Sequence, residues 1–239
     1  MQEHSKPLTS ELERLRVEYD ARERRLAGGD LYSPFNPASL FMLQQRQRVE
    51  LNLLRRHGFS SLESCRILEV GCGRGGVLSN YLGYGASSSN LNGVDLLSDR
   101  LEEAKKRLPA LPLVCADGQR LPYKDASFDL IVQYTVFSSV LDDSIKAGMA
   151  AEMLRVLSKP AGLIIWYDFW LNPTNKQTRG IRPAEIRRLF PNCSFEFHHV
   201  TLAPPIARML VPVSWIAAAV LERLRLFNTH YLVAIRAAG

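Results

Sequence analysis

The stretch that decides the fold reads Ile67-Leu68-Glu69-Val70-Gly71-Cys72-Gly73-Arg74-Gly75-Gly76. A short apolar run, with an acidic residue near its end, passes into a turn that holds four glycines in six residues. Glycine lets a backbone turn tightly and approach a ligand where a Cβ would collide, and the start of a following helix offers unpaired N–H groups. The stretch therefore predicts a strand, a nucleotide-binding turn and a helix.

The kind of ligand at this turn depends on Glu69. Gly71, Gly73 and Gly76 also fit the G-x-G-x-x-G spacing of NAD sites. A carboxylate two residues before the first glycine would attract an ammonium group, whereas it offers nothing to a pyrophosphate. We therefore interpret the turn as Glu69-x-Gly71-x-Gly73-x-Gly75.

From residue 65 onward, strand and helix patterns alternate, which predicts an α/β fold with helices on both faces of a mostly parallel sheet. The predicted strands are 66–70, 91–95, 113–116, 128–133, 163–168, 194–200 and 231–235, the last one antiparallel. In such sheets ligands bind at the carboxyl ends of the strands, where the strand order reverses.

Two helices are predicted before the first strand. One spans Ser10–Leu26 and opens with a capping box, and the other runs from the cap Asn36 to His57. We assign residues 1–58 to an N-terminal helical cap and residues 59–239 to the main domain.

Acidic residues also follow the next two strands. Asp95 lies about two dozen residues beyond Gly71, where a carboxylate accepts hydrogen bonds from ribose hydroxyls. We expect Ser98 to cap the next helix, which leaves Asp95 for the ribose. Asp117 follows the third strand in a run C-A-D-G-Q-R-L-P-Y, which is followed by F-D-L-I-V.

These motifs resemble those of class I S-adenosylmethionine (SAM) methyltransferases over about residues 65–170, and most closely the subgroup of quinone and small-molecule methyltransferases. The resemblance implies a Rossmann-like fold, SAM as cofactor, and contact of Ala116, Asp117 and Gly118 with the adenine. It implies a cofactor site formed by Glu69, Gly71, Cys72, Gly73, Gly75, Asp95, Leu96, Ala116, Asp117, Gly118 and Gln133.

Catalytic residues are harder to derive, because methyl transfer is an in-line displacement in which the protein mainly holds the reactants collinear. A general base is needed only for a poor nucleophile. The candidates that follow strands four and five are Tyr134, as a wall for the methyl group, and Asp168. Asp142 and Asp143 could join Asp168 around a magnesium ion, but helix capping explains both, and we expect no metal.

Beyond strand five, the polar and aromatic stretch at about residues 168–182 is the predicted acceptor loop, because loops on a rigid scaffold carry specificity. It resembles bacterial methyltransferases of surface-polysaccharide and secondary-metabolite clusters. The predicted acceptor-binding residues are Tyr32, Trp170, Asn172, Asn175 and Arg179. Tyr32 and Phe35 would either close over the cofactor or fasten the helices to the core.

Composition narrows the class of protein. Four cysteines without a C-x-x-C pair, and an acidic N-terminal stretch without an apolar core, lead us to expect a reduced, cytoplasmic protein. The net charge is +6, and residues 171–239 hold nine basic and three acidic side chains. Residues 202–221 are largely apolar, and their prolines argue against a membrane span. We predict a buried helix or a lid at about residues 202–226, with peripheral membrane contact as the alternative.

The function that these patterns favour is methylation by SAM, most simply at an oxygen of a small-molecule, glycan or glycolipid acceptor. An RNA methyltransferase is the first alternative because the pI is 9.3, although nucleic acid is not the expected partner, since Gln133-Tyr134-Thr135-Val136 replaces the N-P-P-Y type of tetrapeptide. A SAM-binding regulatory protein without turnover is the second alternative, and an NAD-dependent oxidoreductase is the least favoured.

Overall fold

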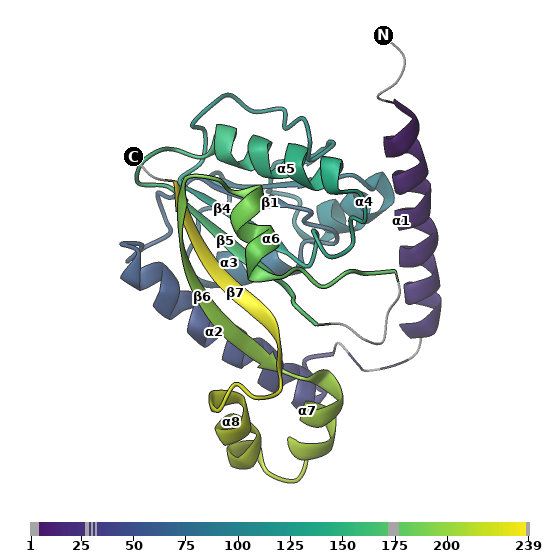
Figure 1. The fold of residues 1–239 in the computed structure, drawn as a ribbon, viewed down its shortest axis with the longest axis vertical. Helices are drawn as coiled ribbons and strands as arrows, with labels where there is room; N and C mark the ends of the chain where they lie inside the picture. Colours follow the sequence, from purple (N-terminus) through teal and green to yellow (C-terminus); the bar gives the residue numbers. More distant parts are fainter. Residues whose placement is uncertain (1–4, 27–28, 30, 32, 172–176, 238–239) are drawn as a thin grey trace.

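The sheet predicted from the alternating pattern is present in the computed structural model, which describes residues 5–26, 29, 31, 33–171 and 177–237. Within this part of the chain, seven strands form one sheet in the order β3-β2-β1-β4-β5-β7-β6 (Figure 1). Its strands are β1 (Ile67–Val70), β2 (Leu91–Asp95), β3 (Leu113–Cys115), β4 (Leu130–Tyr134), β5 (Leu163–Phe169), β6 (Cys193–Leu202) and β7 (Asn228–Ala237). Only β7 runs antiparallel to its neighbours, β5 and β6. The predicted α/β, Rossmann-like fold with an antiparallel last strand is therefore confirmed.

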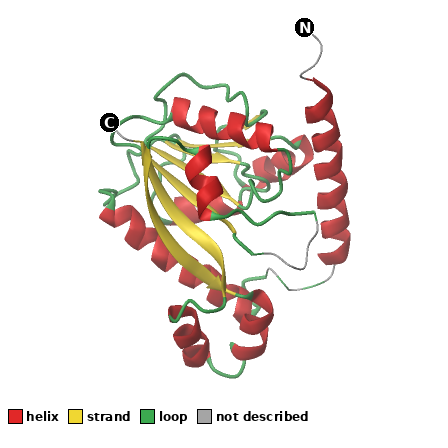
Figure 2. Cartoon of the chain, viewed as in Figure 1, coloured by secondary structure: helices red, strands yellow, loops and turns green. Residues whose placement is uncertain are grey.

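Helices cover both faces of this sheet (Figure 2). The described helices are α1 (Ser5–Leu26), α2 (Pro37–Arg56), α3 (Gly76–Gly83), α4 (Ser98–Arg107), α5 (Asp143–Val156), α6 (Pro183–Leu189), α7 (Pro204–Leu210) and α8 (Trp215–Arg223). One core cluster joins the sheet to α2, α3 and α4, and a second cluster joins its other face to α5 and α6.

The inner strands are largely apolar because both of their faces are buried, whereas the edge strand β6 is mostly half-buried. In β5, Leu163 and Ile165 belong to the first cluster, while Ile164 and Trp166 belong to the second. All four side chains are fully buried. The largely apolar inner strands of the sequence are thus explained by a central sheet between two helical layers.

The helix starts were predicted with mixed success. Asn36 caps α2 by accepting hydrogen bonds from the N–H groups of residues 38 and 39, and Asp142 caps α5 in the same way, both as predicted. The predicted start at Ser10 is wrong, since α1 already begins at Ser5. Ser98 is not a cap either: it lies inside α4, whose cap position is Leu97 and has no side-chain bond.

The apolar stretch near residue 210 differs from the predicted buried helix. It forms two short helices, α7 and α8, because Pro212 and Ser214 interrupt it and the Ser214 side chain starts the second helix. Ala207 and Ala218 pack against Phe41 of α2. Many of the larger apolar side chains lie in solvent instead. No helix in the described ranges is long and apolar enough to cross a membrane.

Gly93, in the middle of β2, gives a test of this packing. A Cβ there would lie 2.8 Å from Cys72 Sγ and 2.9 Å from both Leu113 Cδ2 and Leu78 Cδ1. We expect Gly93→Ala to lower the free energy of unfolding by about 1–3 kcal/mol, the usual cost of overpacking a core. Urea unfolding measures it. In the control, Gly83→Ala, the new Cβ meets nothing within 4 Å, so equal losses in both variants would contradict the packing described.

Candidate cofactor-binding site

A cavity of ≈ 460 Å³ opens at the carboxyl ends of β1, β2 and β4. This is the edge of the sheet at which the strand order reverses. The predicted residues that line it are Glu69, Gly71, Cys72, Gly73, Asp95, Leu96, Ala116, Asp117, Gly118 and Tyr134. The topology therefore brings together residues that are separated by up to 65 positions in the chain, as expected for a single ligand site.

The glycine turn after β1 needs its glycines. Gly71 and Gly73 have φ values of 76° and 50°, which side chains of L-residues rarely adopt. A Cβ on Gly71 would lie 2.3 Å from Cγ2 of Val136, a residue that also lines the cavity. The backbone at this turn can therefore lie directly against a ligand.

Asp95 holds this turn in place. Its Oδ2 accepts a hydrogen bond of 2.7 Å from the N–H of Gly73, and its Oδ1 accepts one of 2.9 Å from the N–H of Leu97. The carboxylate also lines the cavity, and each oxygen keeps a further lone pair. Its predicted role toward ribose hydroxyls is compatible with this geometry and stays a prediction.

Glu69 is the most unusual acid of the site. It is buried, it lines the cavity, and its Oε2 has no hydrogen-bond partner within the part of the chain that the structure describes. Burial, and then the nearby charge of Asp95, raise the pKa of Glu69 well above its usual value. A buried acceptor without a partner is costly unless a ligand supplies the donor, so the Oε2 atom of Glu69 is suited to accept a hydrogen bond from a ligand.

An arginine that the sequence analysis missed lies in the same cavity. Arg46, from the middle of α2, places its Cζ 5.0 Å from the ring centroid of Tyr134 and 4.9 Å from that of Tyr167. Its Nε is buried and has no hydrogen-bond partner among the described residues. The guanidinium is close enough to Glu69 to oppose the rise in the pKa of that carboxyl.

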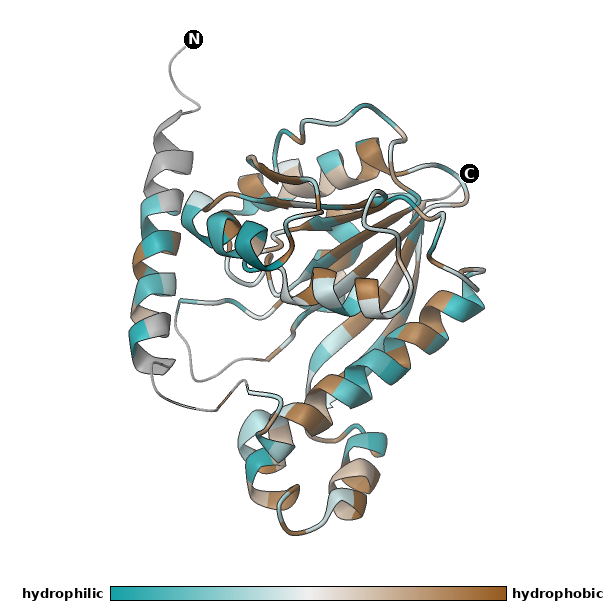
Figure 3. Ribbon diagram, turned by 180° about the vertical axis from the view of Figure 1, so that it is seen from behind, coloured by the Kyte–Doolittle hydropathy of each residue, from teal (hydrophilic) through white to brown (hydrophobic). Residues whose placement is uncertain are grey.

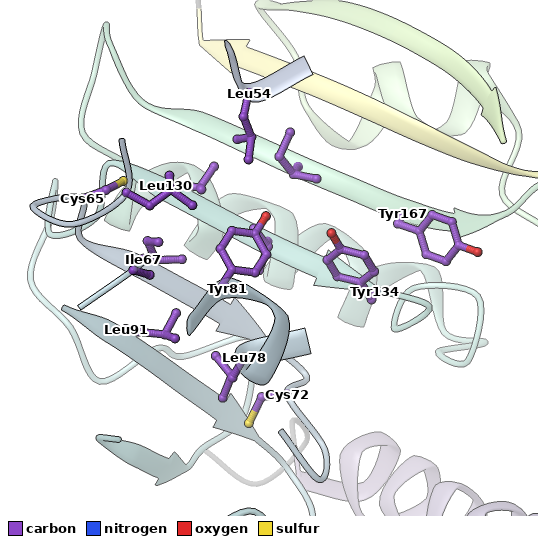
Figure 4. Packing of buried hydrophobic residues seen from close by; sticks show 14 of the residues in the cluster. Leu54, Cys65, Ile67, Cys72, Leu78, Tyr81, Leu91, Leu130, Tyr134 and Tyr167 are labelled. Carbon is purple, nitrogen blue, oxygen red and sulfur yellow. The ribbon is translucent and has the colours of Figure 1, made fainter. Parts of the chain in front are cut away.

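The ring of Tyr134 is fixed from behind by Glu50, a buried residue one helical turn after Arg46 on α2. Glu50 Oε1 accepts hydrogen bonds from the hydroxyls of Tyr134 and Tyr81, the latter at 2.6 Å. Figure 4 shows the rings of Tyr81, Tyr134 and Tyr167 in a row along one face of the sheet. Tyr134, predicted as a wall for the transferred group, thus presents a ring rather than a free hydroxyl.

Together these groups suit a zwitterion. Arg46 provides a positive charge and Glu69 a carboxyl group in the same cavity, and both have an unpartnered buried atom in the described structure. A ligand with a carboxylate and an ammonium group, such as an amino acid, would suit both side chains. The phosphates of a dinucleotide offer Glu69 no favourable charge, because they are negative.

One wall of the cavity comes from α1, which was predicted only as part of the N-terminal helical cap. Glu11, Leu15 and Tyr19 lie four residues apart, so they share a face, and all three line the cavity. Glu11 accepts a hydrogen bond of 2.9 Å from the N–H of Leu141, and the Tyr19 ring lies 4.1 Å from the guanidinium of Arg100 on α4. The spacing of Leu15 and Tyr19 was the available signal.

Two predicted cofactor residues lie outside the lining of the cavity. Gly75 is the cap residue of α3, and a Cβ there would lie 2.7 Å from Leu108 Cδ1. Gln133 is fully buried, and its Oε1 accepts a hydrogen bond of 3.2 Å from the N–H of Val136. Both residues support the walls of the cavity in this structure.

The predicted catalytic and acceptor residues are dispersed. Asp168 is buried next to the site, bonded to the N–H groups of Ser138 and Phe169, and burial raises its pKa to about 6. Trp170 donates a hydrogen bond of 2.8 Å to the carbonyl of Asn228, and Arg179 pairs with the carboxylates of residues 143 and 185. None of the three lines the cavity.

Tyr32, Asn172 and Asn175 lie outside the described residues. Phe35 is 92% exposed and closes over nothing.

The fold recurs among solved structures. A protein from Pyrococcus horikoshii OT3 superposes with a TM-score of 0.61 and 16% identity, covering 90% of this chain and 99% of the other. A TehB-like SAM-dependent methyltransferase from Corynebacterium glutamicum ATCC 13032 gives 0.56 and 18%, covering 93% and 97%. At such identities the likeness establishes the shared fold.

Sequence comparison points the same way. The phthiotriol/phenolphthiotriol dimycocerosates methyltransferase of Mycobacterium leprae is 34% identical over 138 residues, 54% of this chain and 46% of that protein. The fatty-acid O-methyltransferase of Mycolicibacterium smegmatis is 35% identical over 111 residues, 46% of this chain and 39% of that protein. This chain therefore spans about half the length, or less, of these curated relatives.

The matched part of the chain supplies most of the strand ends and loops of the site, while Arg46 and the wall from α1 lie outside it. Residues 68–166 match the family described as a methyltransferase domain, and they include β1, the glycine turn, Asp95 and Asp117. Over residues 68–166 this chain is therefore similar to methyltransferase domains, and the chain as a whole shares the fold of a SAM-dependent methyltransferase of known structure.

Proposed function

We propose that this protein transfers a methyl group from SAM to an oxygen of a lipid or another largely apolar small molecule. The observation that supports this cofactor is the pair Arg46 and Glu69. Both side chains line one cavity, and each has a buried atom without a hydrogen-bond partner in the described structure. SAM carries an amino-acid zwitterion at one end and an adenosine at the other, and it supplies a methyl group already activated by its sulfonium.

The residues of the cavity fit both ends of this cofactor. Arg46 would bind the carboxylate and Glu69 the ammonium group, while Asp95 and Asp117 lie at the ends of the next two strands for the ribose and the adenine. The Tyr134 ring, held by Glu50, would form a rigid wall between the zwitterion and the acceptor. Orientation of the reactants is the main contribution that such a site can make.

The acceptor class is supported by the relatives and by the walls of the cavity. The names of the relatives specify phthiotriol dimycocerosates and fatty acids as acceptors, the latter methylated at oxygen. Apolar side chains from several elements line the cavity here, among them Leu15, Val136, Val140, Ile145 and Met149. Both observations favour an apolar acceptor over a nucleic acid.

Glu69 provides the first test. We expect Glu69→Gln to weaken SAM binding by about 1.5–3 kcal/mol, the scale of a hydrogen bond to a charged group. Because the pKa of Glu69 is raised in the free protein, a bound cation must expel its proton. Affinity of the wild type should therefore rise with pH until that pKa is passed, with proton release on binding. Titration calorimetry in two buffers of different ionisation enthalpy measures both quantities.

The matched control for this variant is Glu63→Gln, which changes an exposed carboxylate before β1. It should keep the wild-type affinity and the wild-type proton release. A Glu69→Gln variant that still releases protons on binding SAM would contradict the placement of the ammonium group.

Arg46 provides the second test, with a ligand that lacks the carboxylate. Wild-type protein should bind decarboxylated SAM more weakly than SAM by about 1.5–3 kcal/mol. Arg46→Met should remove this difference, so that both ligands bind alike. Arg48→Met, on an exposed position of the same helix, should preserve it. An unchanged preference for SAM in Arg46→Met would place the carboxylate elsewhere.

The reaction itself is tested by transfer of a radioactive methyl group from SAM. The acceptors are a long-chain fatty acid, a long-chain alcohol and, for the rival activity, tRNA. We expect label in the organic phase with one of the first two acceptors and none on tRNA. Label on tRNA would establish the RNA activity instead, and tight SAM binding without transfer to any acceptor would indicate a regulatory SAM-binding protein.

A further inference from the structure

The hairpin of α7 and α8 exposes an apolar surface that the proposed reaction does not use. Ile216 and Val220 lie four residues apart on α8, and Leu224 continues this stripe at the C-cap of the helix, while Val213 lies in the turn before it. Val213 is 81% exposed and Ile216 77%. The α7–α8 surface consists of Met209, Val213, Trp215, Ile216, Val220, Leu224, Leu226 and Phe227, all exposed in the described structure.

Figure 3 shows hydrophobic residues along both of these helices, which project from one end of the sheet. Their inner sides already pack against α2 through Ala207, Val211 and Ala218. The exposed stripe is therefore not the side that holds the hairpin to the protein. Large apolar patches of this kind mark contact surfaces.

The exposed charges on the hairpin are all positive. Arg208, Arg223 and Arg225 are exposed among the apolar residues. The only acid between residues 203 and 227 is Glu222, which is buried and accepts a hydrogen bond of 3.0 Å from the N–H of Thr201. An apolar stripe bordered by cations is the pattern of a segment that lies in the plane of an anionic membrane surface.

The hairpin is also connected to the cofactor cavity. Thr201, which holds Glu222 of α8, also bonds through its Oγ1 to the hydroxyl of Tyr167 at 2.8 Å. The Tyr167 ring lines the cavity and lies 4.9 Å from the Arg46 guanidinium. Two hydrogen bonds therefore connect Glu222 of α8 to Tyr167, at the end of the cavity that we assign to the zwitterion.

We propose that the α7–α8 surface docks the protein on an anionic lipid bilayer by shallow insertion of its apolar side chains. A second copy of this chain fits the surface less well, because a two-fold interface pairs each patch with itself and would bring the arginines together. The proposal goes beyond the methylation proposed above, since binding to a bilayer requires neither cofactor nor turnover.

Vesicle flotation of the full chain tests the proposal. We expect binding to vesicles of phosphatidylcholine with phosphatidylglycerol, weaker binding to phosphatidylcholine alone, and release at high salt. Ile216→Glu with Val220→Glu should lower the partition coefficient at least about tenfold, since two apolar side chains become charged. Arg223→Gln should lower it about fivefold, the contribution of one basic residue near an anionic surface. Leu51→Glu, an exposed apolar position on α2, is the matched control and should bind as the wild type does.

Trp215 reports on the orientation, because it is 37% exposed at the edge of the surface, where its ring also meets Phe41, while Trp166 is fully buried and Trp170 is half-buried. Brominated lipid should quench the fluorescence of the wild type much more than that of Trp215→Phe, with equal flotation of both. Circular dichroism and SAM titration of the double variant separate a loss of docking from a loss of fold or of the cofactor site.

Three results would overturn the proposal. The first is flotation that persists in the double variant, and the second is equal quenching in the wild type and Trp215→Phe. The third is absence of flotation of the wild type, together with a dimer in sedimentation velocity that the double variant does not form. The last result would assign the surface to a second copy. Failure of methyl transfer with flotation intact would reject the proposed reaction alone.

Discussion

The carboxylate of Asp95 is the interaction on which the site depends. It joins the turn after β1 to the start of α4 through the N–H groups of Gly73 and Leu97. Two elements that are distant in the chain are thereby held at one sheet edge, with a turn whose positive φ angles leave no room for side chains. The cavity exists because a parallel sheet brings these strand ends together and a single acid fixes the loops between them.

Burying polar groups at the cavity lowers the free energy of unfolding, and burial of apolar side chains in the two core clusters offsets this loss. Glu69 has an oxygen without a partner, and Arg46 has a nitrogen without one, within the described structure. Each such group lowers the stability of the free protein. A ligand of opposite charges removes both penalties, so that binding and folding stability are coupled in this protein. The ligand-free protein is therefore less stable than it would be without these two groups.

The fold was predictable because its signals are local. Strands such as β5 are largely apolar, and Glu69, Asp95 and Asp117 each follow a fixed pattern at a strand end. Arg46 was not predictable in this way, because it lies on a helix before the first strand and reaches the cavity only through tertiary packing.

The exposure of α7 and α8 could not be decided from the sequence for a related reason. An apolar stretch does not reveal whether another part of the chain will cover it, so a buried helix, a lid and a membrane contact all stayed open for residues 202–226. The acceptor residues Trp170 and Arg179 were chosen from a loop whose side chains point to other partners, an asparagine carbonyl and two carboxylates.

The place of β7 in the sheet has a consequence for biosynthesis. β7 lies between β5 and β6, although both of these strands precede it in the chain. A ribosome therefore delivers β5 and β6 before β7, the strand with which both of them pair. During that interval β5 has an open edge, and the apolar hairpin of residues 204–223 has already left the exit tunnel. Such intermediates expose unpaired strand edges and apolar surface, so the nascent chain is most vulnerable to aggregation just before the sheet is completed.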